Sequence, residues 1–590
     1  MLGQLAGPAP GRRARRRAAP APVPGGRGRV QRPARQPRAP ARGAVVPRPP
    51  AAGGRGAHPG RRGRDHQLPG APAGDRQPDP RGRRRRGRPD PRDRRHRLRP
   101  LDLRELRVRR HRRGVGEARR ARRGRGHRLA SGVRRVSVLD GIRAAAPVAS
   151  ASGSGAAAPV TAGFTTRQVH AGSAIDGDHG ARVSPVHLSA GFVFDSFAEA
   201  RDRFAGVDEG YLYTRNGNPT TDEVERRLAE LEGGTEAILL ASGQAATTTA
   251  LLAILQAGDR ILSSSSIYEG NRGLFRQNLG RLGIGVDFVD DHRDLDEWAR
   301  RITPETRVLF GEPIPNPKND LLDLAGIADV AHRHGLPFVV DDTLATPYLL
   351  RPIEHGADVV VHSTSKFLAG HGSVLGGVVV DGGSFDWAAR PDLFPHLNQP
   401  ERSFGGASWA DRFGRGALVA YAREVVASRF GPTPAPFSSF LLRQGIETLS
   451  LRVERHSANA LAVARFLEAR PEVSSVDYAG LESSPSHDLA LRYLPDGQGS
   501  VFSFTLAGGE PAAEAFTDAV RLFSRMTHLG DVRSLVLHPA STTHAGRTPE
   551  ERDAAGIWPG LLRVSIGIED IADILRDLER GLAAARAIGS

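Results

Sequence analysis

Short apolar runs alternate with predicted helices between residues 221 and 381. Strands that alternate with helices in this way are typical of βαβ units, whose strands form a mainly parallel sheet covered by helices. We therefore expect an α/β fold. The expected strands are 237–241, 260–263, 286–289, 308–311, 338–341, 359–362 and a return strand at 376–381, and the expected helices include 221–232, 243–255 and 324–334.

The regular alternation is lost after residue 381, which indicates a domain boundary. An irregular, aromatic-rich stretch runs to about residue 416. Beyond it we expect a smaller α+β domain, with strands at 501–506, 534–538 and 562–566 and helices at 445–469, 512–523 and 571–588. The expected divisions are a tail and linker at 1–160, an N-terminal arm at 161–222 with extended segments, a large domain at 223–440 and a small domain at 441–590.

The first 150 residues differ in composition from the rest of the chain. They contain 43 arginines and 9 acidic residues, a net charge of +34, and no Lys, Phe, Tyr or Trp. The remainder carries a net charge of −16, so the positive total of +18 comes entirely from the tail. Such a segment buries too little apolar surface to offset its ordering entropy, and we expect it to be disordered.

Three interpretations of this tail remain. It is an arginine-rich nucleic-acid-binding arm, a solvated tail, or upstream DNA translated from a mis-assigned start. We favour the third, with a start near Val136 or Val138, because GC-rich DNA read out of frame yields Arg, Pro, Gly and Ala. Nucleic acid is therefore an unlikely partner.

Other functional classes are excluded by what the chain lacks. With no cysteine there is no disulfide, thiolate nucleophile or Cys-ligated metal site. We expect the protein to be located in the cytoplasm. No run approaches the roughly 18 apolar residues of a membrane span. The sequence also has no P-loop Gly-Lys, no zincin His-Glu pair and no Gly-x-Ser-x-Gly elbow.

The chain contains only two lysines, Lys318 and Lys366, against 81 arginines. A buried ammonium can lose its proton and become an amine that forms a Schiff base, whereas a guanidinium stays charged. Lys366 follows an apolar strand and precedes a glycine-rich stretch, and it is flanked by Ser363 and Ser365, whose hydroxyls can bond to a phosphate. Lys366 is therefore the first candidate for a catalytic residue.

Polar groups end three further expected strands, and ligands of open α/β sheets bind at the carboxyl ends of strands. Ser242 opens a helix whose first N–H groups can bind a phosphate, although a plain N-cap explains it equally well. Asp341 would be a costly buried carboxylate unless a cation pairs with it. Asn316 follows a third strand, where an ordinary Asn-Pro turn is the alternative.

These stretches together resemble a known family. The segments 242–245, 339–343 and 362–366 are similar to those of the pyridoxal-phosphate (PLP) enzymes of cysteine and methionine metabolism, most of all to O-acetylhomoserine sulfhydrylases, over about residues 164–590. The resemblance implies the aspartate-aminotransferase-like fold (fold type I). It also implies γ-replacement on O-acetyl- or O-succinylhomoserine with sulfide or a thiol, giving homocysteine. A cystathionine γ-synthase or γ-lyase is the alternative.

The resemblance assigns roles to individual residues. Lys366 is implied to bind PLP as a Schiff base and to move protons, Asp341 to pair with the pyridine nitrogen, and Tyr268 to stack on the ring. Arg563 is implied to clamp the substrate carboxylate, which suits a bidentate guanidinium. The remaining implied ligands are Asn316 at the ring hydroxyl, Ser242, Gly243, Gln244, Ser363 and Ser365 at the phosphate, and His528 near the substrate carboxylate.

Tyr213 and Arg215 resemble the family's Tyr-x-Arg pair, which reaches the phosphate of a neighbouring subunit. The resemblance therefore implies a homo-oligomer, a dimer of dimers with shared active sites. Departures from the family are Asp342 in place of the common Asn, Thr364 in place of Ala, Ser365 in place of Thr, and His528 in place of Ser or Asn. Gly270, where methionine γ-lyases carry Cys, argues against that activity.

Overall fold

The computed structural model of the protein describes residues 162–173, 179–208 and 210–589. The expected tail at 1–160, its nucleic-acid-binding alternative and the proposed start near Val136 lie outside the described residues.

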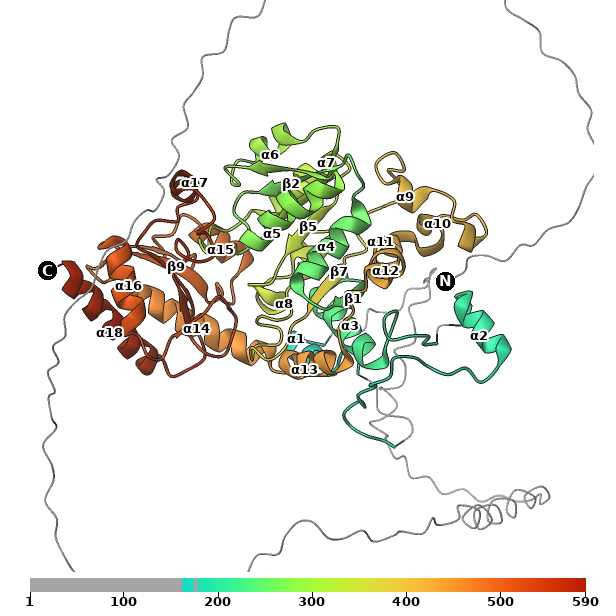
Figure 1. The fold of residues 1–590 in the computed structure, drawn as a ribbon, viewed down its shortest axis with the longest axis horizontal. Coiled ribbons are helices and arrows are strands. Elements are labelled where there is room, and N and C mark those ends of the chain that lie inside the picture. The colour runs from blue at the N-terminus through green and yellow to red at the C-terminus, as the bar shows by residue number, and fades with distance from the viewer. Residues whose placement is uncertain (1–161, 174–178, 209, 590) are drawn as a thin grey trace, which may run out of the picture. The chain divides into compact units, whose positions relative to one another are not determined.

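A seven-stranded sheet forms the centre of the described part (Figure 1), in the order β1-β7-β6-β5-β4-β2-β3. Adjacent strands from β3 to β6 run parallel, and β7 is antiparallel to both β6 and β1. The predicted α/β fold with a mainly parallel sheet and a return strand is confirmed. The strands are β1 (Glu236–Leu240), β2 (Arg260–Ser264), β3 (Gly285–Val289), β4 (Thr306–Gly311), β5 (Phe338–Asp341), β6 (Val359–His362) and β7 (Gly377–Asp381).

The central strands β4, β5 and β6 are mainly apolar, because helices cover both faces of the sheet. Val340 and Val360 pack on the side of α3 and α7, whereas Val339 and Val359 pack on the side of α4 and α11. The helices up to this point are α1 (Phe164–His170), α2 (Phe197–Phe204), α3 (Pro219–Glu232), α4 (Gly243–Ile254), α5 (Glu269–Gly273), α6 (Leu295–Arg301), α7 (Leu324–Arg333), α8 (Thr346–Leu349), α9 (Pro395–Asn398), α10 (Trp409–Phe413), α11 (Ala417–Tyr421) and α12 (Ser428–Phe430).

A second sheet of five strands lies in the C-terminal part, in the order β10-β11-β12-β9-β8. Its core is shared with α14, α16 and α18. The strands are β8 (Val473–Asp477), β9 (Val501–Leu506), β10 (Ser524–Arg525), β11 (Leu535–Leu537) and β12 (Leu561–Ser565), and the helices are α13 (Pro436–Ile446), α14 (Leu449–Glu468), α15 (His487–Tyr493), α16 (Gly509–Ala519), α17 (Pro549–Ala554) and α18 (Ile571–Gly589).

The helix expected at 445–469 is confirmed as α14, but its expected start is wrong, because α13 ends at Ile446 and α14 begins at Leu449. The break is fixed by tertiary contacts rather than by local sequence. The buried Arg452 guanidinium donates to the carbonyl oxygens of Gly445 at 2.6 Å and of Phe367 at 2.7 Å. Arg452 therefore links the break between α13 and α14 to the segment that follows Lys366.

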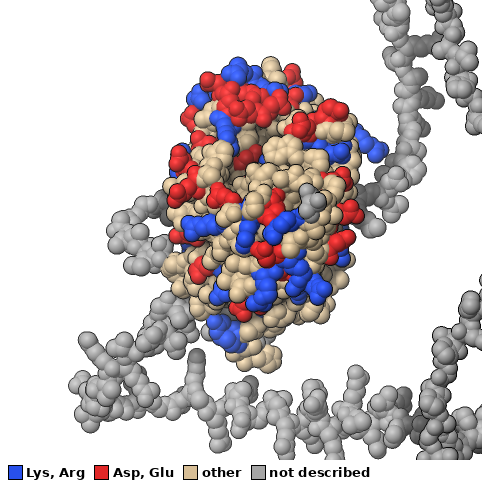
Figure 2. All heavy atoms as spheres, turned by 90° about the vertical axis from the view of Figure 1, so that its left-hand side faces the viewer, with Lys and Arg blue, Asp and Glu red and all other residues tan. Residues whose placement is uncertain are grey.

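None of the described helices is long and apolar enough to cross a membrane. Figure 2 shows the face of the molecule formed by the C-terminal part, on which basic and acidic side chains lie side by side.

Candidate active site

The carboxyl ends of β1 and β6 meet at one edge of the sheet, where Leu240 pairs with Gly377 and His362 with Val378. Two glycines let the chain pack closely at this point. A Cβ on Gly243 would lie 2.5 Å from the Cβ of Ser363, and a Cβ on Gly377 would collide with the carbonyl of Ser242. The start of α4 is therefore pressed against the segment that carries Lys366.

The first turn of α4 presents backbone donors that could cradle an anion, and it is called the cradle below. Ser242 caps the helix, and its side chain accepts a hydrogen bond from the N–H of Ala245 at 3.1 Å. The N–H groups of Gly243 and Gln244 have no acceptor within the helix, because the first turn of any helix leaves its donors free. The Gln244 side chain turns away to the Oδ1 of Asn271 at 2.9 Å, so Gln244 offers the cradle its backbone.

Asp341 ends β5 with its carboxylate held on both oxygens. Thr343 donates to Oδ1 from its N–H at 3.2 Å and its hydroxyl at 2.5 Å, and Asn271 donates to Oδ2 at 3.2 Å. Burial raises the pKa of Asp341, whereas the Thr343 hydrogen bonds oppose that rise. A cation at this carboxylate would offset the cost of burying it.

Lys366 points from the opposite side of the site toward His528. Its Nζ lies 3.2 Å from the Nδ1 of His528. Burial, followed by repulsion from Arg563, lowers the pKa of Lys366 to about 8. Burial and the Lys366 charge lower the pKa of His528 to about 4. The site thus holds an amine that is readily deprotonated beside a neutral imidazole.

Arg563, on β12, is buried next to these groups. Its Nη2 donates to the carbonyl oxygens of Thr527 at 2.9 Å and His528 at 3.2 Å, and its Nη1 to the Oδ1 of Asn316 at 3.3 Å. Burial lowers its pKa to about 10, and no acidic side chain pairs with it among the described residues. The structure therefore places Asn316 and His528 against the unneutralised guanidinium of Arg563.

Other predicted residues are placed differently. The hydroxyl of Ser365 donates to the carbonyl of Gly376 at 3.2 Å and accepts from its N–H at 3.0 Å, so its one proton is used within the chain. Ser363 remains the hydroxyl next to the cradle. Tyr213 and Arg215 lie on the exposed arm, where the guanidinium packs on the Tyr213 ring at 5.4 Å.

Three residues of the site were missed from the sequence. Asn271 joins Gln244 to Asp341, and Thr343 accepts from the N–H of Ser363 at 2.8 Å as well as holding Asp341. Glu312 accepts from the N–H of Tyr268 at 2.8 Å. Burial and the Asp341 charge raise the pKa of Glu312 well above its usual value. Of these three residues, only Glu312 could have been found from the sequence, because it is a carboxylate directly after an apolar strand.

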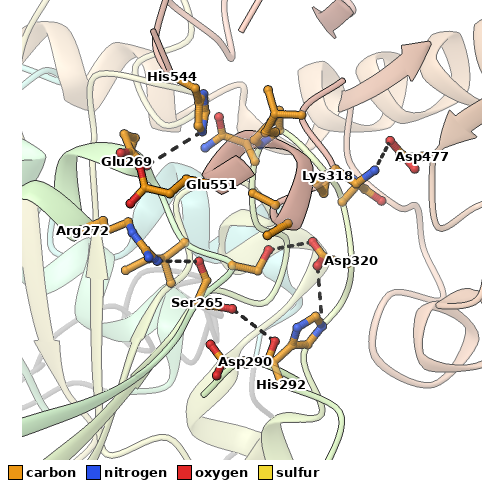
Figure 3. Close-up of a pocket in the computed structure, with 18 of the residues that line it drawn as sticks. Ser265, Glu269, Arg272, Asp290, His292, Lys318, Asp320, Asp477, His544 and Glu551 are labelled. Carbon is orange, nitrogen blue, oxygen red and sulfur yellow. Dashed lines mark hydrogen bonds and ion pairs between the residues drawn. The ribbon is translucent and has the colours of Figure 1, made fainter. Parts of the chain in front are cut away.

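A cavity of about 930 Å³ adjoins the site on the side of Asn316 (Figure 3). Ion pairs line it, including Lys318 with Asp477 at 2.9 Å and Arg547 with Glu269. The second lysine of the chain therefore lies at this wall, with its ammonium also above the Trp558 ring.

These groups fit the PLP that the sequence resemblance implies. The helix start would hold the phosphate, and Asp341 would accept a hydrogen bond from the N–H of a protonated ring nitrogen. The Lys366 amine, with its lowered pKa, would form the covalent link. Tyr268, half-exposed at the start of α5, would cover the ring.

Comparison with known proteins supports the family and the cofactor. The family model "Cys/Met metabolism PLP-dependent enzyme" matches residues 165–583. An O-acetyl-L-homoserine sulfhydrylase of Corynebacterium glutamicum is 45% identical over 72% of this chain and 97% of its own length, and a homocysteine synthase of Schizosaccharomyces pombe is 42% identical over 72% and 98%.

A crystal structure from Campylobacter jejuni, assigned as an O-acetylhomoserine (thiol)-lyase and carrying a pyridoxyl-lysine, matches with a TM-score of 0.69. It is 33% identical over 71% of this chain and 99% of its own. The resemblance, the fold type and the cofactor predicted from the sequence are confirmed. The chain belongs to the family of Cys/Met metabolism PLP-dependent enzymes.

Proposed function

We propose that the protein catalyses γ-replacement on O-acetyl-L-homoserine, in which sulfide takes the place of acetate at Cγ and homocysteine is formed. The observation that carries the proposal is that Lys366 and the buried, unneutralised Arg563 both contact His528, which places an amine of lowered pKa near a guanidinium free to bind a carboxylate. The relatives named as O-acetyl-L-homoserine sulfhydrylase and homocysteine synthase support the substrate.

Each side chain has a task in this reaction. Bound PLP supplies an electron sink for negative charge on the substrate carbons. Lys366 removes and returns protons at Cα and Cβ, and its pKa of about 8 gives it the balance of acid and base that such transfer requires. Arg563 binds the substrate α-carboxylate through its guanidinium.

His528 completes the substrate contacts. Because its Nδ1 faces Lys366, its Nε2 is the nitrogen left to carry the proton, and this buried atom has no partner. An unpaired buried N–H costs free energy until an acceptor reaches it. A substrate oxygen beside Arg563 would be that acceptor, and the cavity on the Asn316 side would be its route in.

The substrate assignment is tested by product analysis. Purified holoenzyme should convert O-acetyl-L-homoserine and sulfide into homocysteine and acetate, in the cytoplasmic range of pH and redox conditions where we place the enzyme. Parallel reactions replace the ester by O-succinyl-L-homoserine and sulfide by cysteine. If cystathionine forms faster than homocysteine, or cystathionine is cleaved instead, the protein is a cystathionine γ-synthase or γ-lyase.

The exposed arm supports a second part of the proposal, a homo-oligomer with shared active sites. Val193 and Phe197 are 88% and 86% exposed in the single chain, and Leu188, Phe204 and Val207 are also strongly exposed. Several strongly exposed large apolar side chains on one arm indicate an interface. We propose that a second copy covers it and that Tyr213 and Arg215 reach the phosphate of that copy, within a dimer of dimers.

Subunit mixing tests the shared site. Arg215→Ala and Asp341→Ala proteins should each be inactive, and mixing them under subunit exchange should restore about a quarter of the parent activity. Half of the dimers are then mixed, and one of their two sites carries neither defect. The control is a mixture of Lys366→Ala and Asp341→Ala, which places one defect in every site and should stay inactive. Lack of recovery in the first mixture, with exchange demonstrated, would mean that Arg215 serves its own subunit.

A further inference from the structure

A buried cluster of three ionisable side chains lies beneath the cofactor site. Glu232 ends α3, Asp342 follows β5 and His362 ends β6. Their exposed fractions are 0%, 0% and 1%, and one polar atom of each lies within 4.8 Å of the others. The Nε2 of His362 contacts the Oε1 of Glu232 at 2.5 Å.

Several atoms of this cluster have no hydrogen-bond partner in the structure. They are both oxygens of Asp342, the second oxygen of Glu232 and the Nδ1 of His362. Within the described ranges no Lys or Arg forms an ion pair with Glu232 or Asp342. Because an unpaired buried carboxylate costs several kcal/mol, Asp342 requires either a cation or a proton.

The geometry favours the proton. Two ligands of one zinc-like ion, each about 2.0–2.1 Å from it, lie about 3.3 Å apart in tetrahedral geometry. Glu232 and His362 are closer than this, at the distance of a direct hydrogen bond, so those two atoms already satisfy each other. A proton on Asp342 would supply a donor for the free oxygen of Glu232 or the free nitrogen of His362. Burial and the carboxylates of Glu232 and Asp341 also raise the pKa of Asp342 well above its usual value.

We propose that Asp342 is a positioning residue that works as a neutral carboxylic acid, donating its proton to the Glu232–His362 pair and so fixing the ends of β5 and β6. These ends carry Asp341 and Ser363 into the site. The backbone supports this role, because the N–H of Asp342 donates to the carbonyl of Val361 at 3.0 Å. The neutral form also keeps a second negative charge away from Asp341. The functional part of this role rests on the proposed task of Asp341 at the cofactor.

The test compares Asp342→Asn with Asp342→Ala in the full-length protein, with and without PLP. Asn keeps a donor but cannot ionise. A carboxyl whose pKa is raised in the folded state weakens folding increasingly as pH rises above about 4, because the unfolded chain has lost the proton that the folded chain retains. The urea midpoint of Asp342→Asn should therefore exceed that of the parent by an amount that grows from about pH 5 to pH 8. PLP affinity should stay within about threefold of the parent for Asn and fall about tenfold or more for Ala.

Each contrary result has a meaning. A stability loss in Asp342→Asn that grows with pH, together with a divalent metal found in the parent and absent from the variant, would mean that a metal ion and not a proton neutralises Asp342. Unchanged PLP affinity in a folded Asp342→Ala protein would make Asp342 part of the core without a positioning role. If the parent itself binds no PLP, the proposed function fails, whereas the pH dependence of the Asn variant still decides the protonation of Asp342.

Discussion

Lys366→Ala should lower turnover by about 10⁴-fold or more and abolish the visible absorbance of the purified protein, because the variant loses both the covalent link to PLP and the proton-transfer group. Lys366 lies buried beside His528 and Arg563, with a pKa lowered to about 8. The loss should show in steady-state homocysteine formation and in an absorbance spectrum.

The chain offers a matched control, since it has only one other lysine. Lys318 is bound to Asp477 at 2.9 Å and lies over Trp558, at the wall of the cavity. Lys318→Ala should keep the absorbance and most of the activity. A borohydride-reduced cofactor attached to Lys318 rather than Lys366 would contradict the assignment.

The central sheet was predictable because its strands are buried on both faces and are therefore continuous apolar runs. β8, in contrast, reads Val-Ser-Ser-Val-Asp and is only partly buried, so its sequence gave no comparable signal. The break between α13 and α14 depends on contacts of Arg452 with a segment about 85 residues away. Local sequence does not record such contacts.

The candidate site shows the same division. Lys366, Asp341 and Ser242 stand at strand ends and carry chemistry that the strand pattern makes visible. Asn271 and Thr343 are ordinary polar residues by sequence, and their importance comes from what they contact, since Asn271 meets Asp341 across 70 residues. The hydroxyl of Ser365 likewise donates to the carbonyl of Gly376, a contact that its own local sequence does not indicate. Residue type predicts chemistry, whereas the direction of a side chain depends on tertiary packing.

Asp341→Asn should retain PLP but lower turnover by roughly 10²–10⁴-fold, the factor that corresponds to about 3–5 kcal/mol for removing one partner of a buried charge pair. An amide no longer holds the ring nitrogen in its protonated form, so the electron sink is weakened. In the parent, both oxygens of Asp341 accept hydrogen bonds from Thr343 and Asn271. In the variant, the NH₂ group replaces one of these acceptors and faces a donor instead. Homocysteine formation at saturating substrate, together with the PLP content of the protein, measures both effects.

Asp342→Asn is the matched control for this prediction, because it makes the same change one residue along the chain, at a fully buried carboxyl. Asp341 accepts hydrogen bonds on both oxygens, whereas Asp342, in the role proposed above, donates to the Glu232–His362 pair. An amide therefore disrupts the first environment and satisfies the second. We expect Asp342→Asn to keep activity within a few-fold of the parent. Equal losses in the two variants would mean that Asp341 has no special contact with the cofactor, and that both carboxyls act only by holding the end of β5.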